Sequence, residues 1–209
     1  MYRLAAFDLD DTLLDPKMEI TPRTIKAIEK AREKGCIITI ATGRMFVSTK
    51  KYMEQIKAEN AIVYNGSMIM DSAGKRLTEL RTPYDLACKV LDIAYKEKIH
   101  VQVYIDDNCY ADHDDKESEL YFSQTAYWPI SVGDLRKFLR VEPTKLLMIG
   151  EVGKIKGLYE ELRPRFEGLL DVTITKPYYL EFCNPLATKG NALMTLAGML
   201  GIDPAEVIA

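Results

Sequence analysis

Cysteine and histidine are scarce in this 209-residue sequence, which has four of the first and two of the second. The cysteines are widely scattered, at Cys36, Cys88, Cys109 and Cys183. They form neither a C-x-x-C pair nor another spacing of zinc ligands, so we expect reduced and mostly buried thiols. The histidines, His100 and His113, show no partner pattern that suggests a catalytic triad. Zinc binding and triad hydrolysis are therefore not indicated.

Long basic runs and long apolar runs are also missing. The 28 basic and 31 acidic side chains give a net charge of −3 without a basic cluster of the kind that binds nucleic acid. An anionic ligand must therefore be held by local groups. The apolar stretch at the N-terminus meets Asp8 and is far too short for the core of a signal peptide or for a membrane span. We expect a cytoplasmic protein with no nucleic-acid or membrane partner.

The first forty residues have the pattern of a strand, a helix and a parallel strand. Continuous apolar runs at 4–7 and 37–41 flank a helical segment at 22–34. Because these runs do not alternate with polar residues, they indicate strands buried on both faces, as in parallel sheets covered by helices. Thr21 can cap the helix and Gly35 can end it. The chain is long enough for one large domain or two small ones.

A second unit of this kind follows, with a helix from about Met45 to Lys57 and a buried strand at 61–64. The segments 68–70 and 76–80 predict a hairpin around Ser72-Ala73-Gly74. Near the end of the sequence, a helix is expected over 188–200.

The pattern of apolar and polar residues changes beyond Pro83. A helical repeat of apolar residues precedes Val101, Val103 and Ile105, which alternate with polar residues as in a sheet with one face in water. Further elements are expected near 145–149, 155–166, 170–174 and 178–182. We predict an α/β fold: a Rossmann-like parallel-sheet core of residues 1–81 and 184–209, with a separate α+β domain of residues 82–183 inserted into it.

The sharpest feature of the sequence is the acidic cluster Asp8-Leu9-Asp10-Asp11-Thr12, directly after the first buried strand. Ligand sites in open α/β sheets lie at this edge. Two carboxylates one residue apart can converge on one ligand only if the chain turns between them. Asp8, at the strand end, is the better nucleophile, and Asp10 is better placed to exchange protons. A helix cap or a solvated loop is the alternative, but no helix starts directly after the cluster and a turn needs only one such residue.

The pattern Asp8-x-Asp10-x-Thr12 resembles the first motif of haloacid dehalogenase phosphatases. The resemblance implies that the first aspartate becomes phosphorylated and that the second is the general acid and base. Position 11 is commonly glycine in that family, and here it is Asp11.

Three further segments carry the same resemblance. Thr42-Gly43-Arg44, at the end of the second strand, resembles the second motif, in which a hydroxyl and backbone N–H groups cradle phosphate. Arg44 could contact the phosphate through two N–H groups of its guanidinium, or it could clamp the inserted domain. Thr188-Lys189-Gly190 resembles the lysine motif, and Asn65-Gly66 matches a feature of the Cof-like branch, although it is equally a turn signal. The resemblance to Cof-like phosphatases, including their large inserted cap, covers essentially the whole chain.

The resemblance implies a magnesium-dependent phosphatase that hydrolyses small phosphorylated metabolites, such as sugar phosphates, through an aspartyl-phosphate. Magnesium would bridge Asp8, the backbone carbonyl of Asp10 and the phosphate oxygens. The residues implied at the phosphate or substrate are Leu9, Thr42, Gly43, Arg44, Asn65 and Lys189. A phosphotransferase or phosphomutase and a non-catalytic phospholigand-binding protein are alternatives. The inserted domain and Asp10 argue against a receiver domain.

An acidic stretch in the inserted domain, Asp106-Asp107-Asn108 with residues 112–115, resembles a calcium loop in composition alone. The central glycine and the terminal glutamate that such a loop requires are missing. A polar hairpin turn is expected there.

Cof-like phosphatases continue after a segment like Gly201-Ile202-Asp203-Pro204 into a Gly-Asp-x-x-Asn-Asp motif, which supplies further magnesium-binding carboxylates. The strand that leads to this motif pairs beside the first strand. The sequence stops at this point, at Ala209. We expect either a longer natural protein or a nearly inactive, marginally stable form with an open edge on its first strand.

Overall fold

The computed structural model describes residues 1–209 and consists of two compact units. One is formed by residues 1–79 with 187–209, and the other by residues 80–186. Each unit has a six-stranded sheet with helices against it, which makes the protein α/β, as the sequence predicts. No helix has the length and apolar character needed to cross a membrane.

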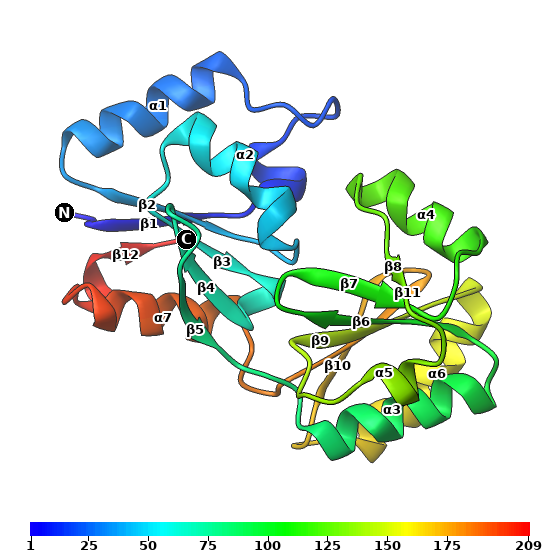
Figure 1. Ribbon diagram of the computed structural model, residues 1–209. Coiled ribbons are helices and arrows are strands. Elements are labelled where there is room, and N and C mark those ends of the chain that lie inside the picture. The colour runs from blue at the N-terminus through cyan, green and yellow to red at the C-terminus, as the bar shows by residue number, and fades with distance from the viewer. The chain divides into compact units, whose positions relative to one another are not determined.

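The first unit alternates strands and helices along the chain (Figure 1). Its strands are β1 (Leu4–Phe7), β2 (Ile37–Ala41), β3 (Asn60–Val63), β4 (Met68–Asp71), β5 (Arg76–Glu79) and β12 (Val207–Ile208). Its helices are α1 (Pro22–Glu33), α2 (Phe46–Ile56) and α7 (Lys189–Met199), with short helical turns at Leu9–Leu13, Tyr64–Gly66 and Pro204–Glu206. The predicted strands 4–7 and 37–41 and the hairpin of β4 and β5 are confirmed.

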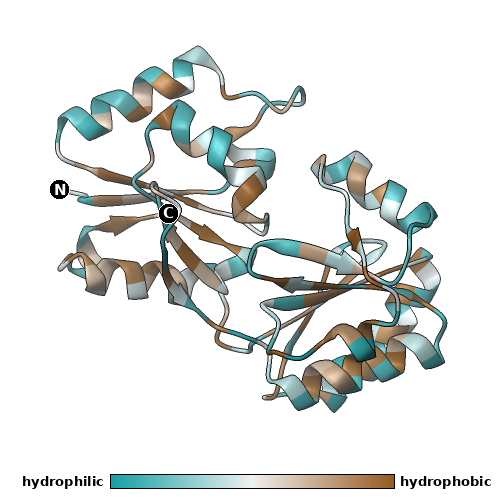
Figure 2. Ribbon diagram, viewed as in Figure 1, coloured by the Kyte–Doolittle hydropathy of each residue, from teal (hydrophilic) through white to brown (hydrophobic).

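The sheet of this unit has the order β12-β1-β2-β3-β4-β5. The first four strands run parallel, and β4 and β5 are antiparallel. In Figure 1, α1 and α2 lie on one face and α7 on the other. Figure 2 shows β2 and β3 largely hydrophobic and α1 largely hydrophilic, because the strands are covered on both faces while α1 has one face in water. The parallel strands therefore place their carboxyl ends at one common edge.

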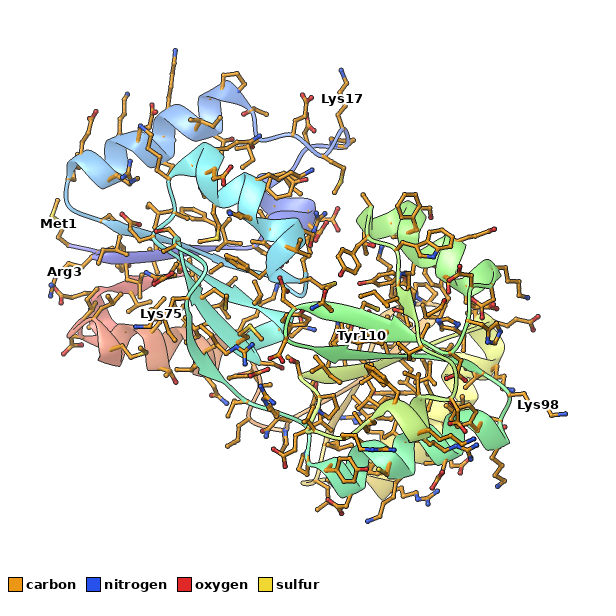
Figure 3. All side chains as sticks on the ribbon, viewed as in Figure 1. Met1, Arg3, Lys17, Lys75, Lys98 and Tyr110 are labelled. Atoms are coloured by element: carbon orange, nitrogen blue, oxygen red, sulfur yellow. The ribbon has the colours of Figure 1, made fainter.

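The expectation of an open edge on the first strand is wrong for the first half of that strand. β12 pairs in parallel with β1, with Leu4 opposite Val207 and Ala5 opposite Ile208. The backbone N–H of Arg3 (labelled in Figure 3) also donates to the carbonyl of Glu206 at 2.8 Å, and the two side chains form an ion pair at 3.1 Å. The segment after α7 thus supplies strand hydrogen bonds that the sequence pattern did not reveal, because only two residues are involved.

The second unit has a mostly antiparallel sheet in the order β10-β11-β9-β6-β7-β8. Its strands are β6 (His100–Ile105), β7 (Asn108–Ala111), β8 (Ile130–Ser131), β9 (Lys145–Ile149), β10 (Asp171–Lys176) and β11 (Tyr179–Cys183). Its helices are α3 (Tyr84–Lys96), α4 (Lys116–Thr125), α5 (Leu135–Phe138) and α6 (Val152–Arg165). The acidic stretch forms the predicted hairpin turn, because Asp106 and Asp107 join β6 to β7 with φ of 49° and 59°.

One face of this sheet carries the apolar core of the unit. Val101 and Val103 of β6 pack there with residues of α3, α5 and α6. The expectation that the opposite face lies in water is wrong, since Gln102 and Tyr104 are fully buried on it. Tyr121 of α4 packs edge-on against Tyr104, with ring centroids 6.3 Å apart. The polar residues of β6 are covered by this helix rather than hydrated.

The buried polar side chains on that face satisfy one another. The amide oxygen of Gln102 accepts from the hydroxyl of Tyr104 at 2.9 Å and from the thiol of Cys109 at 3.2 Å, and its nitrogen lies 3.1 Å from Nε2 of His100. Nδ1 of His100 lies 2.7 Å from the carboxylate of Asp115. His100 therefore has a carboxylate partner that its sequence context did not show. Burial raises the pKa of Cys109 to about 12, which leaves its thiol unreactive.

Candidate active site

Three parallel strands end at the edge where the sequence motifs lie. β1 is followed by Asp8, β2 by Thr42, and β3 by the turn that contains Asn65. Parallel neighbours β1, β2 and β3 bring these segments together, although up to 57 residues separate them in the chain. This is the edge at which open α/β sheets bind ligands.

The acidic segment turns sharply after β1. Asp8 is still extended, at φ −73° and ψ 156°, and its Oδ1 accepts from the backbone N–H of Leu9 at 2.7 Å. Asp11 adopts a left-handed conformation with φ 57°. Glycine adopts this conformation freely and aspartate tolerates it. The backbone conformation therefore explains why aspartate can stand here in place of the glycine that is common in the family. The turn supplies the change of direction that the pair Asp8 and Asp10 requires.

Lys189 lies directly against Asp8. Thr188 caps α7 by accepting from the backbone N–H of Asn191 at 3.0 Å, which fixes the start of the helix at Lys189. Nζ of Lys189 is 2.6 Å from Oδ2 of Asp8, and both side chains are rather more than a third exposed. The structure thus places a lysine and a carboxylate in a charge-assisted hydrogen bond that an anion from solution can reach.

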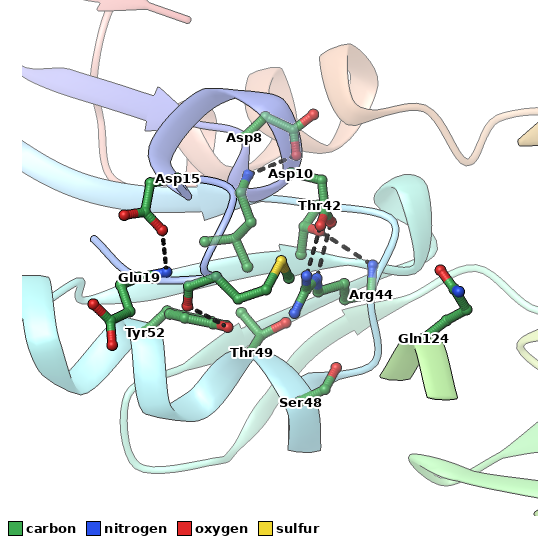
Figure 4. Close-up of polar contacts among 12 residues, drawn as sticks. Asp8, Asp10, Asp15, Glu19, Thr42, Arg44, Ser48, Thr49, Tyr52 and Gln124 are labelled. Atoms are coloured by element: carbon green, nitrogen blue, oxygen red, sulfur yellow. Dashed lines mark hydrogen bonds and ion pairs between the residues drawn. The ribbon is translucent and has the colours of Figure 1, made fainter. Parts of the chain in front are cut away.

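The segment after β2 joins this arrangement through Thr42 and Arg44 (Figure 4). Thr42 is fully buried, and its hydroxyl accepts from the backbone N–H of Arg44 at 3.2 Å. The guanidinium of Arg44 binds both carboxylate oxygens of Asp10, with Nε at 2.9 Å from Oδ2 and Nη2 at 2.6 Å from Oδ1. The hydrogen bond to Asp10 raises the pKa of Arg44, against the opposing effect of burial. In this structure the fork of Arg44 is directed at a carboxylate of the site itself.

Asn65 lies in a backbone conformation that two neighbours share. Tyr64, Asn65 and Gly66 all have positive φ, at 53°, 57° and 108°. The backbone N–H of Asn65 donates to the carbonyl of Thr42 at 3.1 Å. Consecutive left-handed residues other than glycine are costly and persist where the surroundings fix them, often at functional sites. The Asn65 turn is therefore held against the segment that carries Thr42.

Gly66 connects this turn to the lysine motif. A Cβ at residue 66 would lie 2.2 Å from the backbone carbonyl oxygen of Thr188, far inside contact distance. Residue 66 therefore has to be glycine for α7 to begin where it does, and the start of α7 carries Lys189.

We expect Gly66→Ala to destabilise the protein by about 3 kcal/mol or more and to abolish any activity that depends on Lys189, because both φ strain and a backbone collision arise. Gly35→Ala is the matched control. Gly35 also has a left-handed φ, 84°, but a Cβ there meets nothing within 4 Å, so only about 1–2 kcal/mol of φ strain is expected. Denaturant unfolding of both variants measures the difference. Equal losses of stability would show that the close approach to Thr188 is unimportant.

The residues present fit a magnesium ion bound by few protein ligands. No group of three or more His, Cys, Asp or Glu side chains is arranged to hold a metal ion. Magnesium, however, is commonly bound through one or two carboxylates together with waters and substrate phosphate. Asp8 has lone pairs left on both carboxylate oxygens, and it lies in a turn whose carbonyls are also hard oxygen donors. The donor chemistry suits magnesium and does not suit zinc.

One side chain of the site has no signal in the sequence. Tyr52 of α2 is 1% exposed and lies beneath Arg44, with the guanidinium carbon 5.5 Å from the ring centroid. Helical spacing places it on the buried face of α2 with Thr49, Met53 and Ile56. That pattern indicates a core residue and gives no reason to connect it with Asp10.

The fold and the site define a class of protein. The sequence profile of the haloacid dehalogenase-like hydrolases matches residues 5–209, so the chain belongs to this family. Within it, the chain is a phosphatase of the Cof-like branch, the phosphomonoester hydrolases that the sequence motifs resemble.

Curated relatives support this placement. The HMP-PP phosphatase of Serratia proteamaculans is 28% identical over 210 residues, covering all of this chain and 77% of that protein. YitU of Bacillus subtilis, a 5-amino-6-(5-phospho-D-ribitylamino)uracil phosphatase, is 31% identical over 152 residues, covering 69% of this chain and 55% of that protein. The crystal structure of TM0651 from Thermotoga maritima is 27% identical and superposes with a TM-score of 0.88 over all of this chain and 79% of the other. A haloacid dehalogenase-like hydrolase from Bacteroides thetaiotaomicron shares the fold at a TM-score of 0.89 and 22% identity, over all of this chain and 81% of the other.

Proposed function

We propose that the protein hydrolyses phosphate monoesters of small metabolites in two steps, through a phosphate bound covalently to Asp8. The observation that carries this proposal is the contact of 2.6 Å between Lys189 and Asp8, at the sheet edge where Asp10 and Thr42 also lie. A carboxylate with a neighbouring cation at an accessible edge can approach a phosphate dianion, which two unpaired carboxylates would repel.

In the first step, a carboxylate oxygen of Asp8 forms a bond to phosphorus while the bond from phosphorus to the alcohol oxygen breaks. Asp10 gives its proton to that oxygen. In the second step, Asp10 takes a proton from water, the water oxygen bonds to phosphorus, and the bond to Asp8 breaks. Inorganic phosphate leaves and Asp10 is protonated again. Phosphoryl transfer needs mainly positioning and charge neutralisation, and Lys189 supplies one positive charge beside the reacting carboxylate.

Magnesium would be held by the carboxylate of Asp8 and the backbone carbonyl of Asp10. When bound, it neutralises charge on the phosphate oxygens. Thr42, Gly43, Asn65 and the backbone of Leu9 border the same edge and are proposed to contact the phosphate. The second unit, residues 80–186, is proposed to be the cap that discriminates between substrates, as the family resemblance implies.

Small organic phosphates are the proposed substrates. The two named relatives act on HMP-PP and on a phosphorylated ribitylaminouracil. Sugar phosphates and phosphorylated heterocycles are therefore the first compounds to test. With a net charge of −3, nucleic acid is expected to be a poor substrate.

A panel of such compounds, assayed for phosphate release with magnesium and with a chelator, tests the proposal. We expect release that the chelator stops and that added magnesium restores, with one ¹⁸O atom from labelled water in each phosphate. Transfer of phosphate to an added sugar instead of water would indicate a phosphotransferase. Binding of the panel compounds without release would indicate a non-catalytic protein.

A further inference from the structure

We propose that Arg44 is a positioning residue for Asp10 and acts on turnover through that carboxylate, without binding the substrate phosphate. The inference rests on the proposed function of Asp10 as general acid and base. The geometry that points to it is the two-point contact of Arg44 with Asp10, 2.9 Å at Nε and 2.6 Å at Nη2.

The two partners differ in how firmly they are held. The side chain of Asp10 is 51% exposed, whereas that of Arg44 is 17% exposed. Asp10 is followed by the left-handed Asp11, within the short helical turn Leu9–Leu13. A planar guanidinium that binds both oxygens fixes the orientation of the carboxylate as well as its position. The buried residue therefore orients the exposed one.

Arg44 is itself fixed at three points. Its backbone N–H donates to the hydroxyl of Thr42, and its carbonyl accepts from the N–H of Tyr64 at 3.0 Å. Its guanidinium lies over the ring of Tyr52, whose hydroxyl donates to the carbonyl of Met18 at 3.3 Å. Figure 4 shows the hydrogen bonds of Arg44 to Asp10 and to Thr42. Contacts with buried residues of the first unit therefore hold the guanidinium of Arg44 in place.

The direction of the fork separates this role from phosphate binding. Nε and Nη2 form one two-donor edge of the guanidinium, and Asp10 occupies both. A phosphate could be bound by that edge only if the contact with Asp10 were broken. Loss of Arg44 should therefore lower kcat while the affinity for phosphate stays nearly unchanged, since displacement of a reacting group by about 1 Å can cost on the order of 10²-fold in rate.

A double-mutant cycle of Arg44→Ala and Asp10→Asn, with p-nitrophenyl phosphate and magnesium, tests the inference. We expect Arg44→Ala alone to lower kcat by roughly 10²-fold and to change KM and the inhibition constant of inorganic phosphate by less than about 2-fold. In the Asp10→Asn background, Arg44→Ala should change kcat by less than about 3-fold, because the group on which it acts is gone.

Lys51→Met and Arg44→Lys are the matched variants. Nζ of Lys51 lies 4.6 Å from the centroid of the same Tyr52 ring, so Lys51→Met removes a neighbouring cation and should leave kcat unchanged. Arg44→Lys keeps the charge without the fork and should lower kcat about 10-fold at constant KM. It replaces Arg44→Ala in the cycle if thermal unfolding shows that the alanine variant does not fold.

Two results overturn the inference while leaving the proposed function intact. The first is an unchanged kcat with KM and the inhibition constant of phosphate raised tenfold or more, which would make Arg44 a phosphate ligand. The second is an equal loss of kcat in both backgrounds, which would make Arg44 independent of Asp10. Absence of turnover in the unaltered protein would overturn the proposed function and this inference with it.

Discussion

The Asp8→Asn protein is expected to hydrolyse phosphate monoesters at no more than about one part in 10⁴ of the unaltered rate, because the substitution removes the proposed nucleophile. The amide keeps the size and shape of the carboxylate, so the hydrogen bond from the backbone of Leu9 can persist. The amide nitrogen and the neutral amide oxygen are much weaker nucleophiles toward phosphorus than a carboxylate oxygen. The substitution also removes the negative charge that lies 2.6 Å from Nζ of Lys189. Steady-state phosphate release by the purified variant is the measurement.

Asp11→Asn is the control for this experiment. Asp11 lies in the same acidic turn, and asparagine tolerates its φ of 57° at least as well. The control therefore removes one negative charge from the same turn without removing the proposed nucleophile, and turnover should change by only a few fold. If Asp8→Asn retained more than a few per cent of the rate, Asp8 would not be the nucleophile.

The second large effect is expected on stability, at the buried ion pair of the second unit. Nζ of Lys145 lies 3.0 Å from Oε1 of Glu181, and the two side chains are 6% and 9% exposed. Lys145→Met leaves a buried carboxylate with the hydroxyl of Thr175, at 3.1 Å, but without its cation. Loss of one partner of a buried pair typically costs about 3–5 kcal/mol. Urea unfolding followed by the fluorescence of Trp128, the one tryptophan of the chain, reports on this unit.

The double variant Lys145→Met/Glu181→Leu is the decisive companion. Replacing both charges by apolar side chains of similar size removes the desolvation cost together with the attraction, so most of the lost stability should return. A double variant as unstable as Lys145→Met would show that the carboxylate left without the lysine charge is not the cause. A loss below about 1 kcal/mol in the single variant would show that water reaches the pair.

The parallel strands could be read from the sequence because burial on both faces leaves an unbroken apolar run. The parallel strands at 4–7 and 37–41 begin and end where the sequence predicts, and so does the buried antiparallel strand at 145–149. The contact of Asp8 with Lys189 was accessible only through the family resemblance, since 181 residues separate the two and neither local pattern points to the other.

The second face of the inserted sheet could not be read in this way. Alternation of polar and apolar residues predicts a wet face, but Gln102, Tyr104 and Lys145 are polar and buried. Tyr121 of α4 packs against Tyr104, Tyr104 donates to Gln102, and Lys145 pairs with Glu181. The contact of Cys109 with Gln102 joins β7 to β6, and that of Lys145 with Glu181 joins β9 to β11, so no local window contains both partners of the second pair. The two-point contact of Arg44 with Asp10 escapes prediction for the same reason, because the partners are 34 positions apart in the sequence.

Asp8 is expected to carry phosphate during turnover, and acid quenching can trap that state. A substrate labelled in its phosphate is mixed with the protein and magnesium, the reaction is stopped with acid within a turnover, and the labelled site is located by mass spectrometry of peptides. We expect a phosphorylated Asp8 that disappears as free phosphate forms. Label on another residue, or none while phosphate is being released, would contradict it.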